Sequence, residues 1–159
     1  MAMTDTAAQP GGWVDPYRDF NFKLLINNIT NGHFTRVTGL GVKVDAIAYR
    51  EAGDNSIVRA IPGRTTYLPA TLWYGATSST EAWDWLQTAL TGKVSRRNVS
   101  IVLLDAAGST EVTRWNLMNA WPSGWTSESL DAMSREILLH SLVIAYEGLE
   151  LEPGSGGGA

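Results

Sequence analysis

Apolar and polar residues alternate with a period of two over much of the chain. The pattern is clear from Phe20 to Ile26 and again from Val42 to Tyr49. Such alternation predicts half-buried β-strands, because successive side chains of a strand point to opposite faces of a sheet. Further strands are expected at Phe34–Thr38, Tyr67–Trp73, Asn98–Leu104, Glu111–Met118 and Ile137–Tyr146.

Two of these strands have special features. Pro69 lies inside Tyr67–Trp73 and predicts a sheet edge or an irregularity, since proline cannot donate a ladder hydrogen bond. Ile137–Tyr146 is apolar at both odd and even positions. This composition predicts a strand that is covered on both faces.

One segment shows helical spacing instead. Ser78 and Glu81 have the S-x-x-E spacing of a capping box, and Gly92 supplies a stop signal. Trp83, Leu86 and Leu90 are expected to form the apolar stripe of this helix. With about seven strands and a single helix, the predicted fold class is mainly β, a β-sandwich or barrel with one docked α-helix at about residues 79–90.

The two ends lack any periodic pattern. Residues 1–14 read as a flexible N-terminal extension, and residues 152–159 as a flexible Gly-rich tail. The body, residues 15–151, has the length of a single domain.

Composition adds a question about the surface. Hydrophobic residues make up 44% of the 159 residues and charged residues only 18%, with seven tryptophans, whereas an ordinary soluble domain has about 25% charged residues. Either other protein covers part of the surface, or the surface is Thr/Ser-rich and poor in charge. The net charge of −4 argues against a general nucleic-acid surface. No secretory signal or membrane-spanning run is found in the sequence, so a soluble chain is expected.

Candidate catalytic and metal-binding chemistry is sparse. His33 lies in an Asn-Gly turn region and His140 in the most apolar strand, and neither position favours a general base. The absence of cysteine excludes thiolate metal sites and disulfides. Glu147, Glu150 and Glu152 fit a solvated chain end better than a cation site. We expect no enzyme, no metal and no cofactor.

The tryptophans give the main alternative function. Trp115, Trp121 and Trp125 lie in one stretch. Aromatic side chains on a β-sandwich can hold sugar rings, so a Trp-rich carbohydrate-binding module is one hypothesis. Core and interface anchoring is the favoured interpretation, because tryptophan is enriched at protein interfaces.

Several ordered blocks carry a resemblance to a known family. They are residues 15–22, 34–40, 49–55, 61–63, 83–85, 92–98, 102–105, 115–122 and 146–148. Together they resemble the tail tube proteins of contractile phages and of phage-tail-like contractile injection systems. The Leu72-Trp-Tyr-Gly75 segment is more aromatic than is usual in that family.

The resemblance implies a structural subunit that assembles into stacked hexameric rings, forming a hollow inner tube within a contractile sheath. Its implied partners are further copies of itself, the sheath protein, baseplate or tube-initiator proteins, and cargo, either DNA or an effector protein, in the lumen. Assembly in the bacterial cytoplasm is implied, with the finished tube part of a virion tail or of a released injection particle. Whether the particle is a phage or an injection system stays open.

The resemblance also assigns residues. Tyr49–Asn55 is similar to the extended hairpin or loop of the family that contacts neighbouring subunits, although an ordinary solvated turn is the alternative. The candidate contacts there are Tyr49, Arg50, Glu51, Asp54 and Asn55. The acidic side of the helix, with Glu81, Asp84 and Gln87, is expected to face the sheath. Ten acidic and five basic residues follow residue 75, which suggests a neutral to anionic lumen wall.

Overall fold

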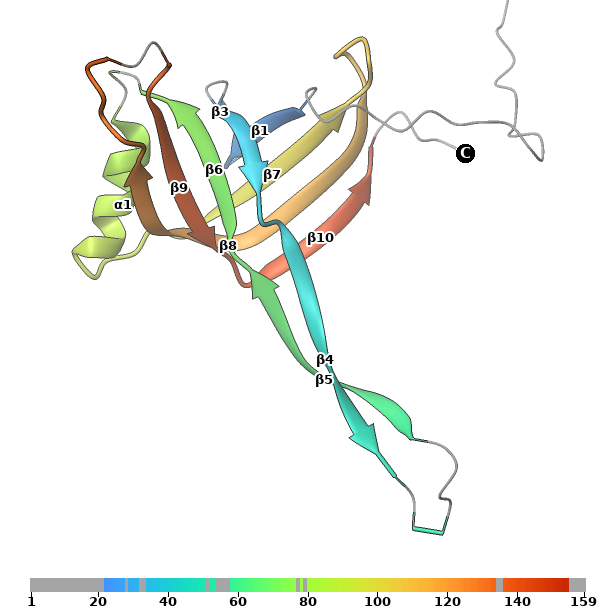
Figure 1. Ribbon diagram of the computed structural model, residues 1–159. Helices are drawn as coiled ribbons and strands as arrows, with labels where there is room; N and C mark the ends of the chain where they lie inside the picture. Colours follow the sequence, from blue (N-terminus) through green and yellow to red (C-terminus); the bar gives the residue numbers. More distant parts are fainter. Residues whose placement is uncertain are drawn as a thin grey trace, which may run out of the picture.

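The strands and the single helix follow one another in a simple order along the part of the chain that the structure describes. The computed structural model describes residues 22–27, 29–31, 34–50, 52–53, 58–76, 78, 80–133 and 136–154 (Figure 1). Its elements are β1 (Phe22–Ile26), β2 (Ile29–Asn31), β3 (Phe34–Thr38), β4 (Gly41–Tyr49), β5 (Arg59–Leu68), β6 (Ala70–Gly75), α1 (Glu81–Leu90), β7 (Arg97–Leu104), β8 (Glu111–Ser127), β9 (Leu139–Ala145) and β10 (Gly148–Pro153).

Eight strands form one antiparallel sheet in which β8 joins two halves. The strand order is β2-β1-β7-β8-β9-β6-β3, and β10 pairs with β8 beside this path. Strand β8 pairs with β7 and β10 through its first part, and with β9 through Trp121–Ser127. The sheet curves so that both halves contribute to one core (Figure 1). This confirms the predicted fold class of a mainly β subunit with one helix, in the form of an open sheet.

The core draws its side chains from both halves. Leu24, Val99 and Leu117 come from one half, and Leu72, Leu142 and Ile144 from the other. All six are at most 1% exposed. Their burial contributes to the hydrophobic stabilisation that holds the two halves together.

The turn of β8 between the halves is fixed by polar contacts. Asn119 adopts a positive φ of 51°, and its backbone N–H donates to Asn98 Oδ1 at 3.3 Å. The side-chain amide of Asn119 donates to Glu147 Oε2 at 3.2 Å, and Glu147 is ion-paired with Arg96. Asparagine tolerates the left-handed region better than other side chains, which suits it to this position.

The helix buries a different side from the predicted one. Trp85 and Leu86 are buried, whereas Trp83 is 42% and Leu90 65% exposed. The predicted stripe is therefore wrong for two of its three members. Trp85 holds the helix in this orientation, because its Nε1 donates to the carbonyl oxygen of Ser95 at 2.7 Å. The predicted capping box that begins at Ser78 is also wrong, since Thr80 is the N-cap. At the other end, Gly92 has a φ of 78° and directly follows the C-cap residue Thr91.

Several strand boundaries differ from the sequence-based expectation. The expected strand Tyr67–Trp73 is two strands, β5 and β6, separated at Pro69. The predictions missed β2, β10 and most of β5, and ended β8 too early. In β9 one face is buried, but residues 139, 143 and 145 on the other face are only half-buried, and Ile137, which precedes the strand, is 79% exposed. Burial of both faces was therefore wrong within the single subunit.

Candidate assembly surface

Strands β4 and β5 form an antiparallel ribbon that projects from the body (Figure 1). We call this ribbon, residues 41–49 and 59–68, the arm. It pairs only with itself and forms a separate two-stranded sheet in the described part of the chain. A lone two-stranded ribbon is marginal in water, so the arm gains stability from any surface that covers it.

The root of the arm is held by the core. The Tyr146 hydroxyl donates to the Gly41 carbonyl oxygen at 3.0 Å and accepts from the Gly41 N–H at 3.3 Å. The rings of Tyr67 and Tyr146 are 5.9 Å apart. Burial raises the pKa of the Tyr146 hydroxyl, while the hydrogen bond to Gly41 opposes that rise. These contacts fix the direction in which the arm leaves the body.

A glycine is required where β3 passes into the arm. Gly39 has a φ of 79°, and a Cβ atom placed there would lie 2.7 Å from the carbonyl oxygen of Pro69. Only glycine avoids both the backbone strain and this clash. The sharp change of direction at the root is therefore encoded in the sequence.

One face of the arm carries no charged side chain. Alternate residues of β4 share this face with their cross-strand partners. The pairs are Val42 with Tyr67, Val44 with Thr65, Ala46 with Pro62, and Ala48 with Ala60. Tyr67 packs against the core, so this uncharged arm face continues the core surface beyond the body. On this face Val42 is 50% and Val44 51% exposed.

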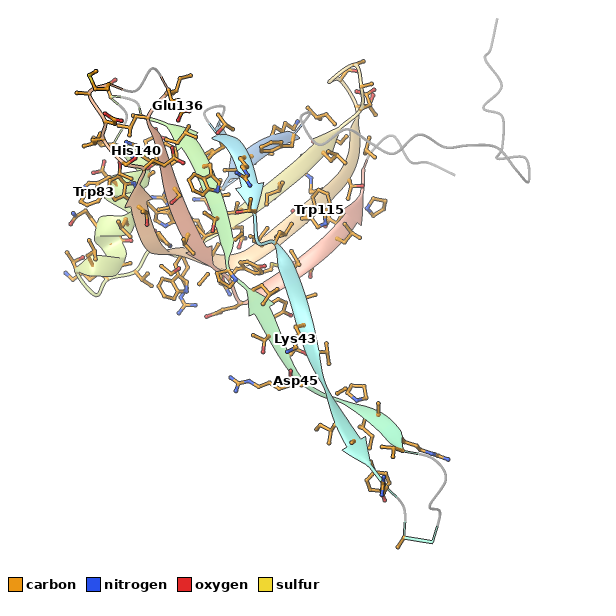
Figure 2. The ribbon with its side chains drawn as sticks, in the orientation of Figure 1. Lys43, Asp45, Trp83, Trp115, Glu136 and His140 are labelled. Atoms are coloured by element: carbon orange, nitrogen blue, oxygen red, sulfur yellow. The ribbon has the colours of Figure 1, made fainter. Side chains whose placement is uncertain are left out.

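The opposite face of the arm is mixed. Lys43 and Asp45 form a salt bridge of 3.8 Å there, and both are labelled in Figure 2. Ile47 lies beyond them on the same strand and remains 54% exposed. Apolar side chains thus stay exposed on both faces, and exposed patches of this kind mark interaction sites.

Two of the five predicted interface residues lie at the outer end of the arm. Tyr49 ends β4 and Arg50 follows it, and both side chains are exposed. Glu51, Asp54 and Asn55 lie outside the described residues. The sequence reasoning missed the uncharged arm face, although the alternation in 42–49, combined with a second strand at 59–68, could have revealed it. The role of these residues in assembly stays a prediction.

The helix presents its acidic residues away from the core. Glu81 and Asp84 are exposed and Gln87 is half-buried. The Thr80 hydroxyl donates to Asp84 Oδ2 at 3.0 Å. These positions are accessible to a partner, and their contact with a sheath stays a prediction.

Two of the three candidate sugar-binding tryptophans belong to the packing of the subunit. Trp115 and Trp125 pack against the core. Trp125 Nε1 donates to the Tyr74 hydroxyl at 2.9 Å, and its ring meets that of Trp83 edge-on at 5.3 Å. These rings are engaged with other side chains, which does not favour a sugar-binding role.

The remaining candidate residues lie within the sheet, at its turns, or outside the described residues. His140 lies between aromatic rings, 5.7 Å from that of Tyr74 and 5.1 Å from that of Trp125, on β9 (Figure 2). His33 lies outside the described residues. No group of three or more His, Asp or Glu side chains suited to a metal is present among the described residues. Glu147 forms an ion pair with Arg96 and accepts a hydrogen bond from the side-chain amide of Asn119.

A small ionic network lies on the first half of the sheet. Glu111 contacts Arg114 at 2.9 Å and Lys23 at 3.2 Å. The hydrogen bond from Arg114 and the nearby Lys23 hold the pKa of Glu111 below its ordinary value of 4.5.

Within the described residues, no helix has the length and apolar composition needed to cross a bilayer.

Comparison with known proteins identifies the family. A chain of the sheath–tube complex of PVC, an extracellular contractile injection system, is 27% identical, with a TM-score of 0.78 over 87% of this chain and 92% of that chain. A chain of the PVC sheath/tube terminator is 26% identical, with a TM-score of 0.80 over 89% of this chain and 99% of that one. The tube-terminating cap of the anti-feeding prophage shares the fold at 24% identity, with a TM-score of 0.82 over 94% and 99% of the two chains.

No curated protein sequence is significantly similar to the chain. The family model of the T4-like virus tail tube protein gp19, however, matches residues 18–150, which is most of the sequence. With the open β-sheet, the single docked helix and the projecting arm, this match shows that the chain belongs to the gp19 tail tube family of structural proteins.

Proposed function

We propose that this chain is the inner-tube subunit of a contractile injection particle. In this role it assembles into hexameric rings that stack into a hollow conduit, and contraction of a surrounding sheath drives the tube through a target envelope. The likeness to chains of PVC complexes at 26–27% identity supports an injection system over a phage tail. Membership in a family of structural proteins supports a role without catalysis.

The observation that carries the proposal is the uncharged arm face. It continues the surface of the core, yet no second layer of the described chain covers it. A neighbouring subunit that supplied this layer would bury Val42 and Val44 and stabilise the ribbon. Repetition of one such contact from copy to copy builds rings or filaments.

The other surfaces are assigned accordingly. The exposed carboxylates Glu81 and Asp84, with Gln87, face the sheath protein, and baseplate or tube-initiator proteins start the tube. DNA or an effector protein travels in the lumen, past a wall that is neutral to anionic. Assembly takes place in the bacterial cytoplasm, and the tube leaves the cell only within the finished particle. Residues 15–151 act as one tube domain between the two terminal segments.

Light scattering coupled to size-exclusion chromatography, with negative-stain electron microscopy, tests the proposal on the purified full chain. We expect hexamers, rings and short tubes whose proportion rises with concentration, and longer tubes when sheath and baseplate proteins are added. A chain that stays monomeric in all of these mixtures would contradict the proposal.

A further inference from the structure

We infer that the loop between β8 and β9 is the surface that receives the arm of a second copy of this chain. We call residues 128–133 and 136–138 the acceptor loop. The inference rests on the proposed function, because it assumes that the arm is an assembly contact. It adds where on the partner the outer end of the arm binds.

The acceptor loop exposes apolar side chains to an unusual degree. Leu130 is 81%, Met133 89% and Ile137 79% exposed, which are the three highest values among the large apolar side chains that the structure describes. Leu130 and Ile137 also line a hollow of about 370 Å³, together with the acidic Glu128, Asp131 and Glu136. The loop therefore combines exposed apolar surface with a recess that could admit a protruding side chain.

Charge and exposed apolar surface together favour the arm as the occupant of this recess. Residues 128–138 carry three acidic and one basic side chain, a net charge of −2, whereas the arm with its connection, residues 41–68, carries four basic and three acidic side chains, a net charge of +1. The outer stretch, residues 50–59, has two basic and two acidic residues in the sequence, and its exposed Arg50 and Arg59 flank the apolar Val58, which is 51% exposed. The helix, with Glu81 and Asp84, would instead be repelled by the acidic loop.

The placement of the two surfaces suits a repeating contact. The arm and the acceptor loop extend from opposite ends of the body (Figure 1), and Figure 2 shows Glu136 of the loop far from Lys43 and Asp45 of the arm. The arm therefore cannot reach its own loop. A contact between different surfaces of two identical chains is heterologous, and it leaves one arm and one loop free for the next copies. This arrangement is what a stack of rings requires.

Disulfide trapping tests the inference directly, because the chain contains no cysteine. One preparation carries Val58→Cys and a second carries Met133→Cys. The two are mixed, assembled and treated with a mild copper–phenanthroline oxidant. In the matched control, Leu90→Cys, which is also exposed but lies on the helix, replaces Met133→Cys. A disulfide needs its two Cα atoms within about 7 Å, so the product reports direct contact.

We expect the Val58→Cys and Met133→Cys chains to form a disulfide-linked heterodimer at least about tenfold more than the control pair, since docking raises the effective concentration of the two thiols. Adding Glu128→Lys to the Met133→Cys chain should lower this yield, because it reverses a charge beside the recess. Tubes that form with no excess of this heterodimer over the control would overturn the inference alone. The absence of rings and tubes would overturn the proposed function as well.

Discussion

The uncharged arm face can be tested with one substitution on each side of the ribbon. Val44→Asp places a carboxylate on this face, whereas Thr66→Asp places one on the opposite face, across from Lys43. Val44 is already 51% exposed in the single subunit, so the fold of the body should hardly change. Exposed substitutions of this kind typically alter the free energy of unfolding by no more than about 0.5 kcal/mol.

The effect on assembly should be much larger. Covering the exposed half of a valine contributes roughly 1 kcal/mol, given about 1.5–3 kcal/mol for full burial. An unpaired carboxylate in the covered contact costs about 3–5 kcal/mol more. The sum of roughly 4–6 kcal/mol corresponds to a rise of about a thousandfold or more in the concentration needed for assembly.

Light scattering against protein concentration measures that threshold, and thermal unfolding of the dilute subunit provides the folding control. Val44→Asp should remain folded and fail to assemble, while Thr66→Asp should assemble close to the level of the unchanged protein. Tube formation by Val44→Asp at the normal concentration would refute the assignment of this face. Equal failure of both variants would refute the distinction between the two faces.

Two further substitutions probe the root of the arm and the ionic network. Tyr146→Phe removes both hydrogen bonds to Gly41, so urea unfolding should show a loss of about 1–2 kcal/mol and hydrogen exchange should speed up in the arm; unchanged exchange would count against the anchoring role. Because Arg114 and Lys23 lower the pKa of Glu111, its contribution to stability is present above pH 4.5 and is lost as the pH falls through the lowered value. Glu111→Gln should therefore flatten the acid side of the stability curve, and a curve with the original slope would rule out this ionic contribution.

The sequence predicted the fold class well because period-two alternation reports the face of a strand that meets the core. It failed where both faces are exposed or where a strand is long. Strand β5 lies in the arm, away from the core, so its sequence shows little alternation of apolar and polar residues. Pro69 was predicted to lie inside one strand, whereas it separates β5 from β6. Strand β8 continues past Met118 through a positive-φ Asn119, which local patterns do not reveal.

The site was predicted only in part for a related reason. Charged residues such as Arg50 stand out in a sequence, whereas Val42 and Val44 look like ordinary buried strand residues. They are exposed because no other layer of the described chain packs on the arm. This is a property of the tertiary structure, which the periodicity of the sequence does not reveal. The helix likewise buries Trp85 in place of the expected stripe, because the indole N–H of Trp85 donates to the carbonyl oxygen of Ser95.

Strand β8 has a mechanical consequence. A single 17-residue strand takes part in both halves of the sheet, and β9 and β10 follow one another along its length. Bending one half away from the other would therefore distort the backbone of β8 itself, and not a loop between two separate sheets. The change of direction between the halves, at Asn119, is itself held by Asn98 and Glu147, so the two halves behave as one body.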